Sequence, residues 1–511
     1  MDVAIFLGAL FLAGGVSVLQ GRALVGLGSD HYVHLFLVNV IRENGRRLFT
    51  RIPRLLNPAY CSAYPLFLHW FLSFLKNEQL VGVSRYYNPV VNLLQVALTY
   101  LALRLVPDVS PLAGMLTALF AATPQFLHAF SARNYGLTAR PLGLLFFGCF
   151  GYCVVRLRLE GVSLPWMGGA LLAGYCVWGF NTFAAQTMLL AGLLLLAVFG
   201  FWQMMALAAA SVLLFVCLHP AYGPSYLFNT FRFSKAYATD LAPLFILNRR
   251  PSIWRDLILD CWREIARQRQ HGLSYTYSNP VVMVVCLNPL VLLGACLAWS
   301  GDATPPFVRL CAEMSFAGLA AFLLTSFRPT RFLGEPERYV EMMSFFSAVA
   351  GGWWLWHRFG MTGLALVGVY FVGCDLVQLV IAQMTRKHIS DDNAEWLGVA
   401  DLVEREMNGT PVRFASNNED MIKWLMGRSW EFARLNSADQ DYAGYRVSQV
   451  ISKWPLVRLE AFEALLRMYR INVCLLDRAN YAEVFSSGVN APQRQHLLFE
   501  NHRVRVMRLD W

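Results

Sequence analysis

Residues 28–34, with the sequence GSDHYVH, follow directly on the first apolar stretch of the chain and decide how the rest is interpreted. One acid and two histidines stand here, at the point where the chain leaves a hydrophobic segment. Asp30 and His34 are four residues apart, so a helix starting here would place both on one face. Ionisable groups are costly to hold at the boundary of a bilayer, which makes this stretch a candidate functional site.

The surrounding chain has the composition of a polytopic membrane protein. Of its 511 residues, 56% are hydrophobic and only 15% are charged, whereas soluble proteins have about 25% charged residues. About 20 apolar residues are needed to cross a bilayer, and this criterion predicts about eleven spans, with residues 164–219 fitting either two or three crossings. The expected spans are Val3–Gln20, Pro89–Val106, Pro111–Phe130, Pro141–Val155, Leu164–Phe180, Thr182–Gly200, Phe201–His219, Pro280–Trp299, Phe307–Phe327, Glu341–Trp356 and Thr362–Met384.

Residues 1–386 would form a transmembrane domain with two long outer loops, 21–87 and 220–279. The second loop contains short apolar pieces, which fit helices lying in the membrane interface. This domain holds 27 basic and 16 acidic residues. Anionic headgroups or a phosphate-bearing ligand would explain the basic excess. A nucleic-acid partner is not expected, because no basic stripe interleaved with aromatic residues occurs in a soluble part.

Residues 387–511 have the composition of a soluble domain, with 16 basic and 17 acidic residues. The pattern predicts strands at 412–416 and 471–476, with helices after the first strand and before the second. A final hairpin is expected at 497–509, turning at Asn501-His502. The predicted fold is therefore a polytopic α-helical membrane protein with a C-terminal soluble α/β domain.

From Asp30 onward the sequence resembles the integral-membrane C-type glycosyltransferases, which have the GT-C fold. The likeness rests on GSDHYVH after the first span, a following amphipathic helix that ends in RENG, the motif YPLFLH at 64–69, the arginine- and acid-rich loop 328–341, and the terminal soluble domain. This resemblance implies sugar transfer from a polyprenyl-phosphate donor on the outer or lumenal side, with the C-terminal domain outside. The family's catalytic base is an acid in the first outer loop, and that position matches Asp30.

The candidate catalytic residues are Asp30 as the base and His34 beside it, since sugar transfer needs a group that deprotonates the acceptor. A carboxylate at this position could instead be only the N-cap of the next helix. His31, Tyr64 and His69 are candidates for orienting the base or binding the acceptor. No metal or other cofactor is predicted, and a divalent metal is left as an alternative. The spacing of these residues is not a known ligand signature. Relatives that need a metal carry further acids in their early outer loops, whereas residues 131–140 contain no acid and no Asp-x-Asp motif occurs beside Asp30.

The candidate ligands of the donor phosphate are arginines, because planar guanidinium groups bind phosphate oxygens in pairs. Arg331 and Arg338 in the loop 328–341 are the first choice, although each arginine of this loop has an acid that could pair with it. Arg133 and Arg140, with no acid nearby in the sequence, are the second choice.

These observations predict an inverting membrane glycosyltransferase that transfers a hexosyl or pentosyl group. Its partners would be a polyprenyl-phosphate sugar, a glycan, lipid or protein acceptor, and membrane lipids. It would lie in the cytoplasmic membrane, or in the endoplasmic reticulum of a eukaryote. Two alternatives remain open: a transporter or lipid flippase with a basic cavity and no chemistry, and a family-like scaffold that has lost its activity.

Overall fold

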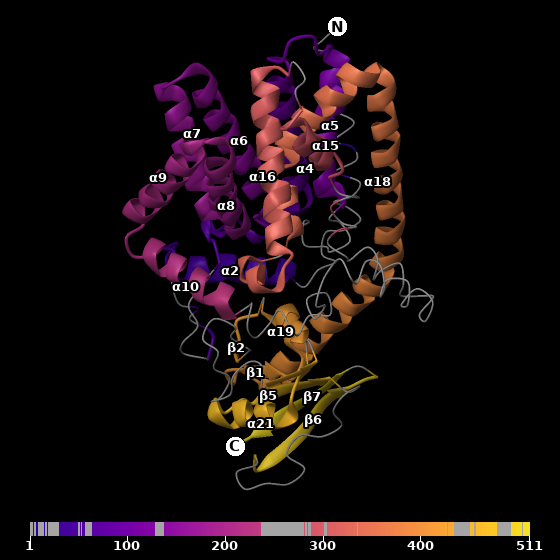
Figure 1. Cartoon of the computed structure of the whole chain (residues 1–511). Coiled ribbons are helices and arrows are strands. Elements are labelled where there is room, and N and C mark those ends of the chain that lie inside the picture. The colour runs from indigo at the N-terminus through magenta and orange to yellow at the C-terminus, as the bar shows by residue number, and fades with distance from the viewer. Residues whose placement is uncertain are drawn as a thin grey trace.

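The structure of the chain is a computed structural model, shown in Figure 1. A helical bundle forms one end of the molecule and a small sheet domain forms the other. The structure describes residues 4, 7–8, 15, 18, 30–49, 52, 54–56, 64–127, 137–236, 281, 284, 288–300, 304–334, 336–426, 428–433, 450–453, 456–477, 492–502 and 504–511.

The bundle is built from the helices that the apolar stretches predict. They are α4 (Asn77–Leu103), α5 (Pro111–Leu127), α6 (Arg140–Glu160), α7 (Leu164–Phe180), α8 (Thr182–Phe199), α9 (Trp202–Leu218), α15 (Leu290–Leu297), α16 (Pro306–Thr325) and α18 (Ser344–Met407). Within the described residues, α6, α8 and α16 are long and apolar enough to cross a membrane, and Pro111–Phe120 and α9 are shorter apolar helices. The chain is thus a multi-pass membrane protein, and its total of about eleven spans stays a prediction.

The nearly continuous apolar segment 164–219 forms three helices, α7, α8 and α9. Asn181 separates the first two, and its side-chain oxygen accepts a hydrogen bond from the Ala184 amide at 3.0 Å, which caps α8. Gly200 ends α8 in the left-handed conformation, with φ of 63°. Local capping signals therefore divide this segment into three helices, and the number of them that cross the membrane stays a prediction.

Helix α18 joins the bundle to the sheet domain. It breaks at Gly360, whose φ of 57° and ψ of −144° lie outside the helical region. Figure 1 shows the chain turning at the end of the bundle remote from the C-terminal domain and then running back along the whole bundle. The second arm, residues 361–407, is about 70 Å long at 1.5 Å per residue. The expected domain boundary at residue 386 lies within this arm, and it stays a prediction.

Five short elements gather at the end of the bundle that faces the C-terminal domain (Figure 1). They are α2 (Asp30–Glu43), α3 (Phe67–Leu72), α10 (Gly223–Ala236), the 3₁₀ helix η5 (Arg328–Leu333) and α17 (Glu337–Met342). Helix α3 has only six residues, too few to cross a bilayer. All the described elements that carry predicted site residues therefore lie at one end of the bundle, near the N-terminus of α6.

The C-terminal domain contains a five-stranded mixed sheet in the order β2-β1-β5-β7-β6. Strand β1 runs parallel to β2 and β5, whereas β7 runs antiparallel to β5 and β6. The expected hairpin is present, formed by the last two strands of this sheet. The elements are β1 (Arg413–Ser416), α19 (Glu419–Leu425), β2 (Glu431–Phe432), β3 (Ile451–Lys453), β4 (Leu456–Val457), α21 (Leu459–Met468), β5 (Val473–Asp477), β6 (Arg494–Glu500) and β7 (Val504–Asp510).

The segment that follows α2 extends this sheet. Leu55 forms a parallel bridge with Phe432 at the edge of β2, and the Phe432 amide donates to the carbonyl oxygen of Arg54 at 3.0 Å. The Arg54 guanidinium pairs with Glu43 at the end of α2 and donates to the backbone oxygen of Arg428 at 2.8 Å. The C-terminal domain thus holds the loop that carries α2.

Candidate active site

Two histidines from the short helices α2 and α3 form a buried pair. His34 lies on α2 and is 5% exposed, and His69 lies on α3 and is fully buried. The Nδ1 atom of His34 and the Nε2 atom of His69 are 2.9 Å apart, and the rings stack with centroids 5.2 Å apart. Such a hydrogen bond needs one nitrogen that carries a proton and one that does not. The pair can therefore carry at most one positive charge while the bond stays intact.

Burial makes the charged form of His69 unfavourable. Removal from water lowers the pKa of His69 well below its usual value of 6.5, and the neighbouring His34 lowers it further. His69 is therefore neutral at pH 7. A neutral imidazole in contact with His34 can accept or pass on a proton, which an already charged one cannot do.

Tyr64 completes this cluster. Its ring lies edge-on to both imidazoles, with centroids 5.6 Å from His34 and 5.7 Å from His69. Tyr64 is 41% exposed, so the cluster reaches the surface on this side. Its backbone oxygen accepts a hydrogen bond from the Tyr222 hydroxyl at 3.0 Å. Nothing in the sequence near Tyr222 marks it as a partner of Tyr64, and it was not among the predicted site residues.

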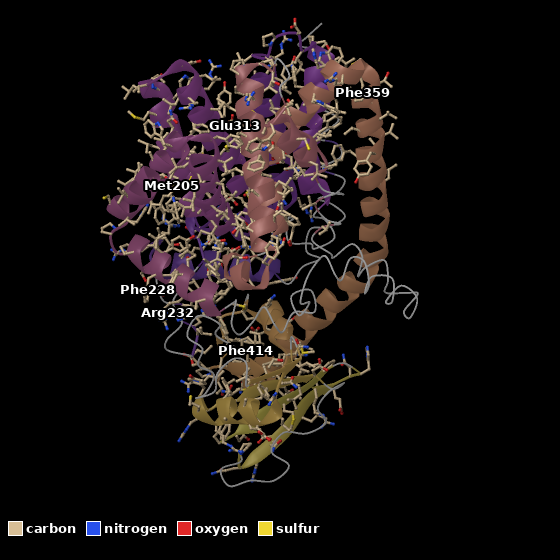
Figure 2. The ribbon with its side chains drawn as sticks, in the orientation of Figure 1. Met205, Phe228, Arg232, Glu313, Phe359 and Phe414 are labelled. Atoms are coloured by element: carbon tan, nitrogen blue, oxygen red, sulfur yellow. The ribbon has the colours of Figure 1, made fainter. Side chains whose placement is uncertain are left out.

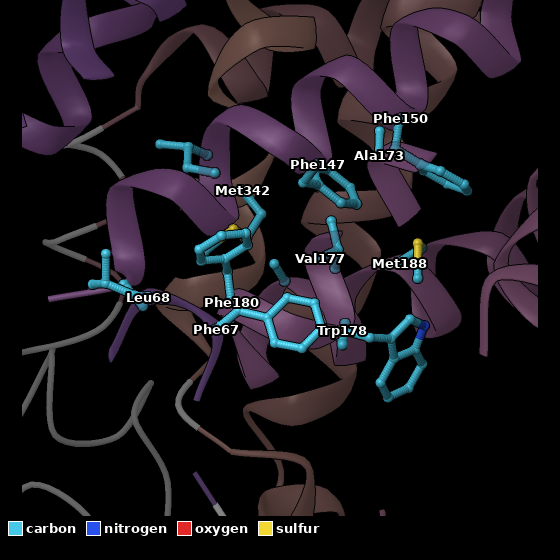
Figure 3. Close-up of a cluster of buried hydrophobic side chains, with 14 of the residues drawn as sticks. Phe67, Leu68, Phe147, Phe150, Ala173, Val177, Trp178, Phe180, Met188 and Met342 are labelled. Atoms are coloured by element: carbon cyan, nitrogen blue, oxygen red, sulfur yellow. The ribbon is translucent and has the colours of Figure 1, made fainter. Parts of the chain in front are cut away.

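Helix α3 is held in place by the ring of Phe67, which packs against the backbone of α7. A Cβ atom on Gly179 would lie 1.9 Å from this ring, so glycine is required there. The Phe67 ring also packs against the rings of Phe180 and Phe215, with 5.8 Å between ring centroids in each case. Figure 3 shows Phe67 and Phe180 among the buried side chains of the bundle, with Met342 of α17 beside them. This packing fixes the helix that carries His69.

A second cluster contains two of the predicted phosphate ligands. Arg140 is the first residue of α6, and Arg338 lies in α17. Both guanidinium groups approach the same oxygen, Oε2 of Glu341: Arg140 makes a short ion pair with it, and Nη1 of Arg338 lies 3.5 Å from it. The three side chains are 12%, 6% and 2% exposed. Glu337, one turn earlier in α17, is buried as well.

Arg140 has no acid near it in the chain, as the sequence shows, and its ion-pair partner is Glu341, 201 residues away. Arg338 is paired within its own helix, as the sequence allows, and shares Glu341 with Arg140. Phosphate binding by these arginines stays a prediction.

The two clusters share a neighbour, the junction between α7 and α8. Gly143, in the first turn of α6 near Arg140, packs so closely on Asn181 that an added Cβ atom would lie 2.3 Å from the Asn181 side chain. Gly179, two residues before Asn181, contacts Phe67 of α3. The histidine pair and the arginine pair thus lie on the same side of the membrane domain.

The remaining predicted residues are placed less completely. Asp30 and His31 are the first two residues of α2, and Arg331 lies in η5, but their side chains lie outside what the structure describes, as does Arg133 entirely. Their roles stay predictions. In the described part of the chain, no three His, Cys, Asp or Glu side chains are grouped so that they could hold a metal ion.

No protein-family model matches the chain, and no curated protein matches it. Solved structures do. The apo oligosaccharyltransferase of Archaeoglobus fulgidus matches with a TM-score of 0.54 and 13% identity, over 92% of this chain and 69% of that chain. ArnT of Cupriavidus metallidurans, bound to undecaprenyl phosphate, matches with a TM-score of 0.46 and 12% identity over 99% and 97%. AglB of Archaeoglobus fulgidus, with an inhibitory peptide and a dolichol-phosphate, matches with a TM-score of 0.46 and 12% identity over 92% and 69%. The chain therefore has the GT-C fold of membrane glycosyltransferases.

Proposed function

We propose that the protein is a membrane glycosyltransferase, which transfers a sugar from a polyprenyl-phosphate donor to an acceptor on the side of its C-terminal domain. The GT-C fold, shared with an oligosaccharyltransferase, supports this class of reaction. The observation that carries the proposal is the buried pair of His34 and His69. His34 of this pair lies one helical turn after Asp30 on α2. The pair lies at the bundle end that also holds the cluster of Arg140 and Arg338.

In the proposed reaction, an acceptor hydroxyl attacks C1 of the sugar as Asp30 takes its proton. The new bond joins C1 to the acceptor oxygen, and the bond from C1 to the phosphate oxygen breaks, which inverts the configuration at C1. The polyprenyl phosphate leaves with the bonding electrons. His34, four residues after Asp30 on α2, would take the proton onward into the pair with His69, since that pair can hold one added proton.

The donor phosphate would be held by Arg140 and Arg338, whose guanidinium groups already meet at one oxygen of Glu341. Neutralising the charge that develops on the leaving phosphate is the main electrostatic requirement of the step. Arg331 and Arg133 are further candidates for the same task. Tyr64, exposed next to both imidazoles, is the proposed contact for the acceptor. The acceptor would be a glycan, a lipid or a protein.

The orientation follows from arginines at the two ends of α6. Arg156 and Arg158 end this helix on the face remote from the C-terminal domain. Short cytoplasmic loops are enriched in such residues. Arg140, at the other end, is the largely buried partner of Glu341 and so is not a free loop charge. We therefore place the C-terminal domain outside, in the cytoplasmic membrane or its eukaryotic counterpart in the endoplasmic reticulum.

The test is Asp30→Asn in the full-length protein, assayed for transfer of a labelled sugar from a polyprenyl-phosphate carrier. Loss of a general base predicts a fall in turnover of about 100-fold or more. Asp108→Asn is the matched control, because Asp108 is exposed at the remote end of the bundle; its turnover should be unchanged. Full activity of Asp30→Asn would remove the base role. Transport of the carrier lipid across sealed vesicles with no glycosylated product would favour a flippase instead.

A further inference from the structure

Helix α10 has two faces of different chemistry. Tyr226 and Asn229 are 1% and 4% exposed and face the bundle, whereas Phe228 and Phe231 are 61% and 68% exposed. Arg232 is exposed beside them, and its guanidinium carbon lies 5.7 Å from the centre of the Phe228 ring. Figure 2 shows Phe228 and Arg232 next to each other on the flank of the molecule.

The charge on this helix has one sign. Residues Gly223–Ala236 contain Arg232 and Lys235, both exposed, and no acid. The helix lies at the level where the bundle ends and the C-terminal domain begins (Figure 1). Exposed phenylalanines next to cations at this level are typical of a helix that lies in the membrane interface, with its rings among the acyl chains and its cations among the phosphates.

We propose that α10 is a binding surface for anionic phospholipid headgroups of the leaflet on the side of the C-terminal domain. Arg232 and Lys235 bind the headgroup phosphates, and Phe228 and Phe231 insert beside them. Each basic side chain near an anionic surface strengthens binding by about fivefold. The partner is a bulk phospholipid rather than a protein, because exposed aromatic rings at the edge of a membrane domain face lipid.

The same helix is tied to the candidate active site. The Tyr222 hydroxyl donates to the Tyr64 backbone oxygen, and the Tyr222 ring stacks on Tyr226 at 5.5 Å. The Tyr226 hydroxyl lies 3.0 Å from the hydroxyl oxygen of Thr182, at the start of α8. Headgroups that fix α10 would thereby also fix Tyr64. This second step rests on the proposed function of Tyr64, whereas the lipid binding does not.

The test is hydrogen–deuterium exchange of the whole protein in nanodiscs of phosphatidylcholine, with and without 30% phosphatidylglycerol, and without polyprenyl phosphate. We expect the amides of 223–236 to exchange at least about threefold more slowly in the anionic nanodiscs. The double variant Arg232→Ala/Lys235→Ala should lose this difference. Arg358→Ala is the matched control, because Arg358 is exposed next to the exposed Phe359 at the opposite end of the bundle (Figure 2); it should keep the difference.

Equal exchange of 223–236 in both nanodiscs, or a double variant that keeps the lipid dependence, would overturn the proposal. So would protection that appears only when polyprenyl phosphate is added to phosphatidylcholine nanodiscs, since the surface would then belong to the donor site. The variant Tyr222→Phe tests the link: protection of α10 should remain, and protection of residues 64–72 should fall. None of these readouts needs turnover, so a failed glycosyltransferase assay leaves them interpretable.

Discussion

The two ends of helix α6 hold an arginine in opposite ways. At the start of the helix, Arg140 is 12% exposed and pairs with Glu341, which is 2% exposed and 201 residues away in the chain. At the end, Arg156 is 22% exposed and pairs with Glu160, which is 39% exposed and one turn away on the same helix. The pair of Arg140 and Glu341 joins distant parts of the membrane domain, whereas the pair of Arg156 and Glu160 lies on a single helix.

The two ion pairs differ in how deeply they are buried. A carboxylate buried with two guanidinium groups is costly to assemble and is kept only where packing and hydrogen bonds fix it. A half-exposed pair spaced i, i+4 contributes little to stability and is screened by salt. The pair at the start of α6 is therefore expected to depend on packing, whereas the pair at its end is expected to respond to salt.

The largest effect is expected from Glu341→Ala, which leaves Arg140 and Arg338 buried without their shared carboxylate. Breaking a buried pair in this way costs about 3–5 kcal/mol. The free energy of unfolding should be measured in mixed micelles by circular dichroism as the denaturant concentration rises. Glu160→Ala, which removes the matching acid at the remote end, should cost less than about 1 kcal/mol.

Glu341→Gln sharpens the same comparison, because it keeps the shape of the side chain and removes its charge. If these guanidinium groups hold the donor phosphate, polyprenyl phosphate should restore part of the lost stability of this variant. Comparable losses for Glu341→Ala and Glu160→Ala would show that the two ends do not differ. A Glu341→Gln variant that polyprenyl phosphate leaves unchanged would argue against phosphate binding by this cluster.

Much of the fold could be predicted from the sequence, and the pairings in the site could not. Apolar runs and helix caps are local signals, so the boundaries of α7, α8 and α9 follow from them. His34, His69 and Arg140 could be named as candidates because ionisable residues stand out in apolar sequence. Their partners could not, since only packing brings together residues 35 or 201 positions apart. Strand β2, with two residues, is too short to show any periodicity.

A second prediction concerns pH and the histidine pair at the site end. Because the pKa of His69 in the folded protein lies well below 6.5, the unfolded chain takes up a proton first as the pH falls. Stability should therefore fall from pH 6.5 downward, by up to about 2 kcal/mol at pH 5. Unfolding of the wild type and of His69→Gln should be compared at pH 7.5 and pH 5.

His69→Gln should lack this part of the pH dependence, even though it is less stable at both pH values. His357→Gln is the control from the remote end, where His357 is exposed and stacks on Trp353; it should keep the wild-type dependence. If His69→Gln and the wild type lose the same stability between pH 7.5 and pH 5, the histidine pair is not the titrating group.

A smaller effect is expected at the contact between the site end and the C-terminal domain. Arg54→Ala removes the ion pair with Glu43 and the hydrogen bond to the Arg428 backbone oxygen. Because Glu43 is 44% exposed, the loss should be about 1–1.5 kcal/mol. Hydrogen exchange should become faster at the Leu56 and Phe432 amides, which bond across this edge. Unchanged exchange there would mean that the backbone bridge holds the loop without Arg54.

The smallest effect belongs to Arg156→Ala at the remote end of α6. Its pair with Glu160 is half-exposed, and its guanidinium carbon also lies 5.5 Å from the centre of the Trp166 ring. Both contacts are local and partly exposed, so their removal should cost no more than about 1 kcal/mol and should leave sugar transfer unchanged. Raising the salt concentration should remove most of this cost, whereas the cost of Glu341→Ala should persist because that pair is largely buried and is screened less. A salt-independent loss at Arg156 as large as that at Glu341 would make the two ends of α6 equivalent, and the assignment of the site to one of them would fail.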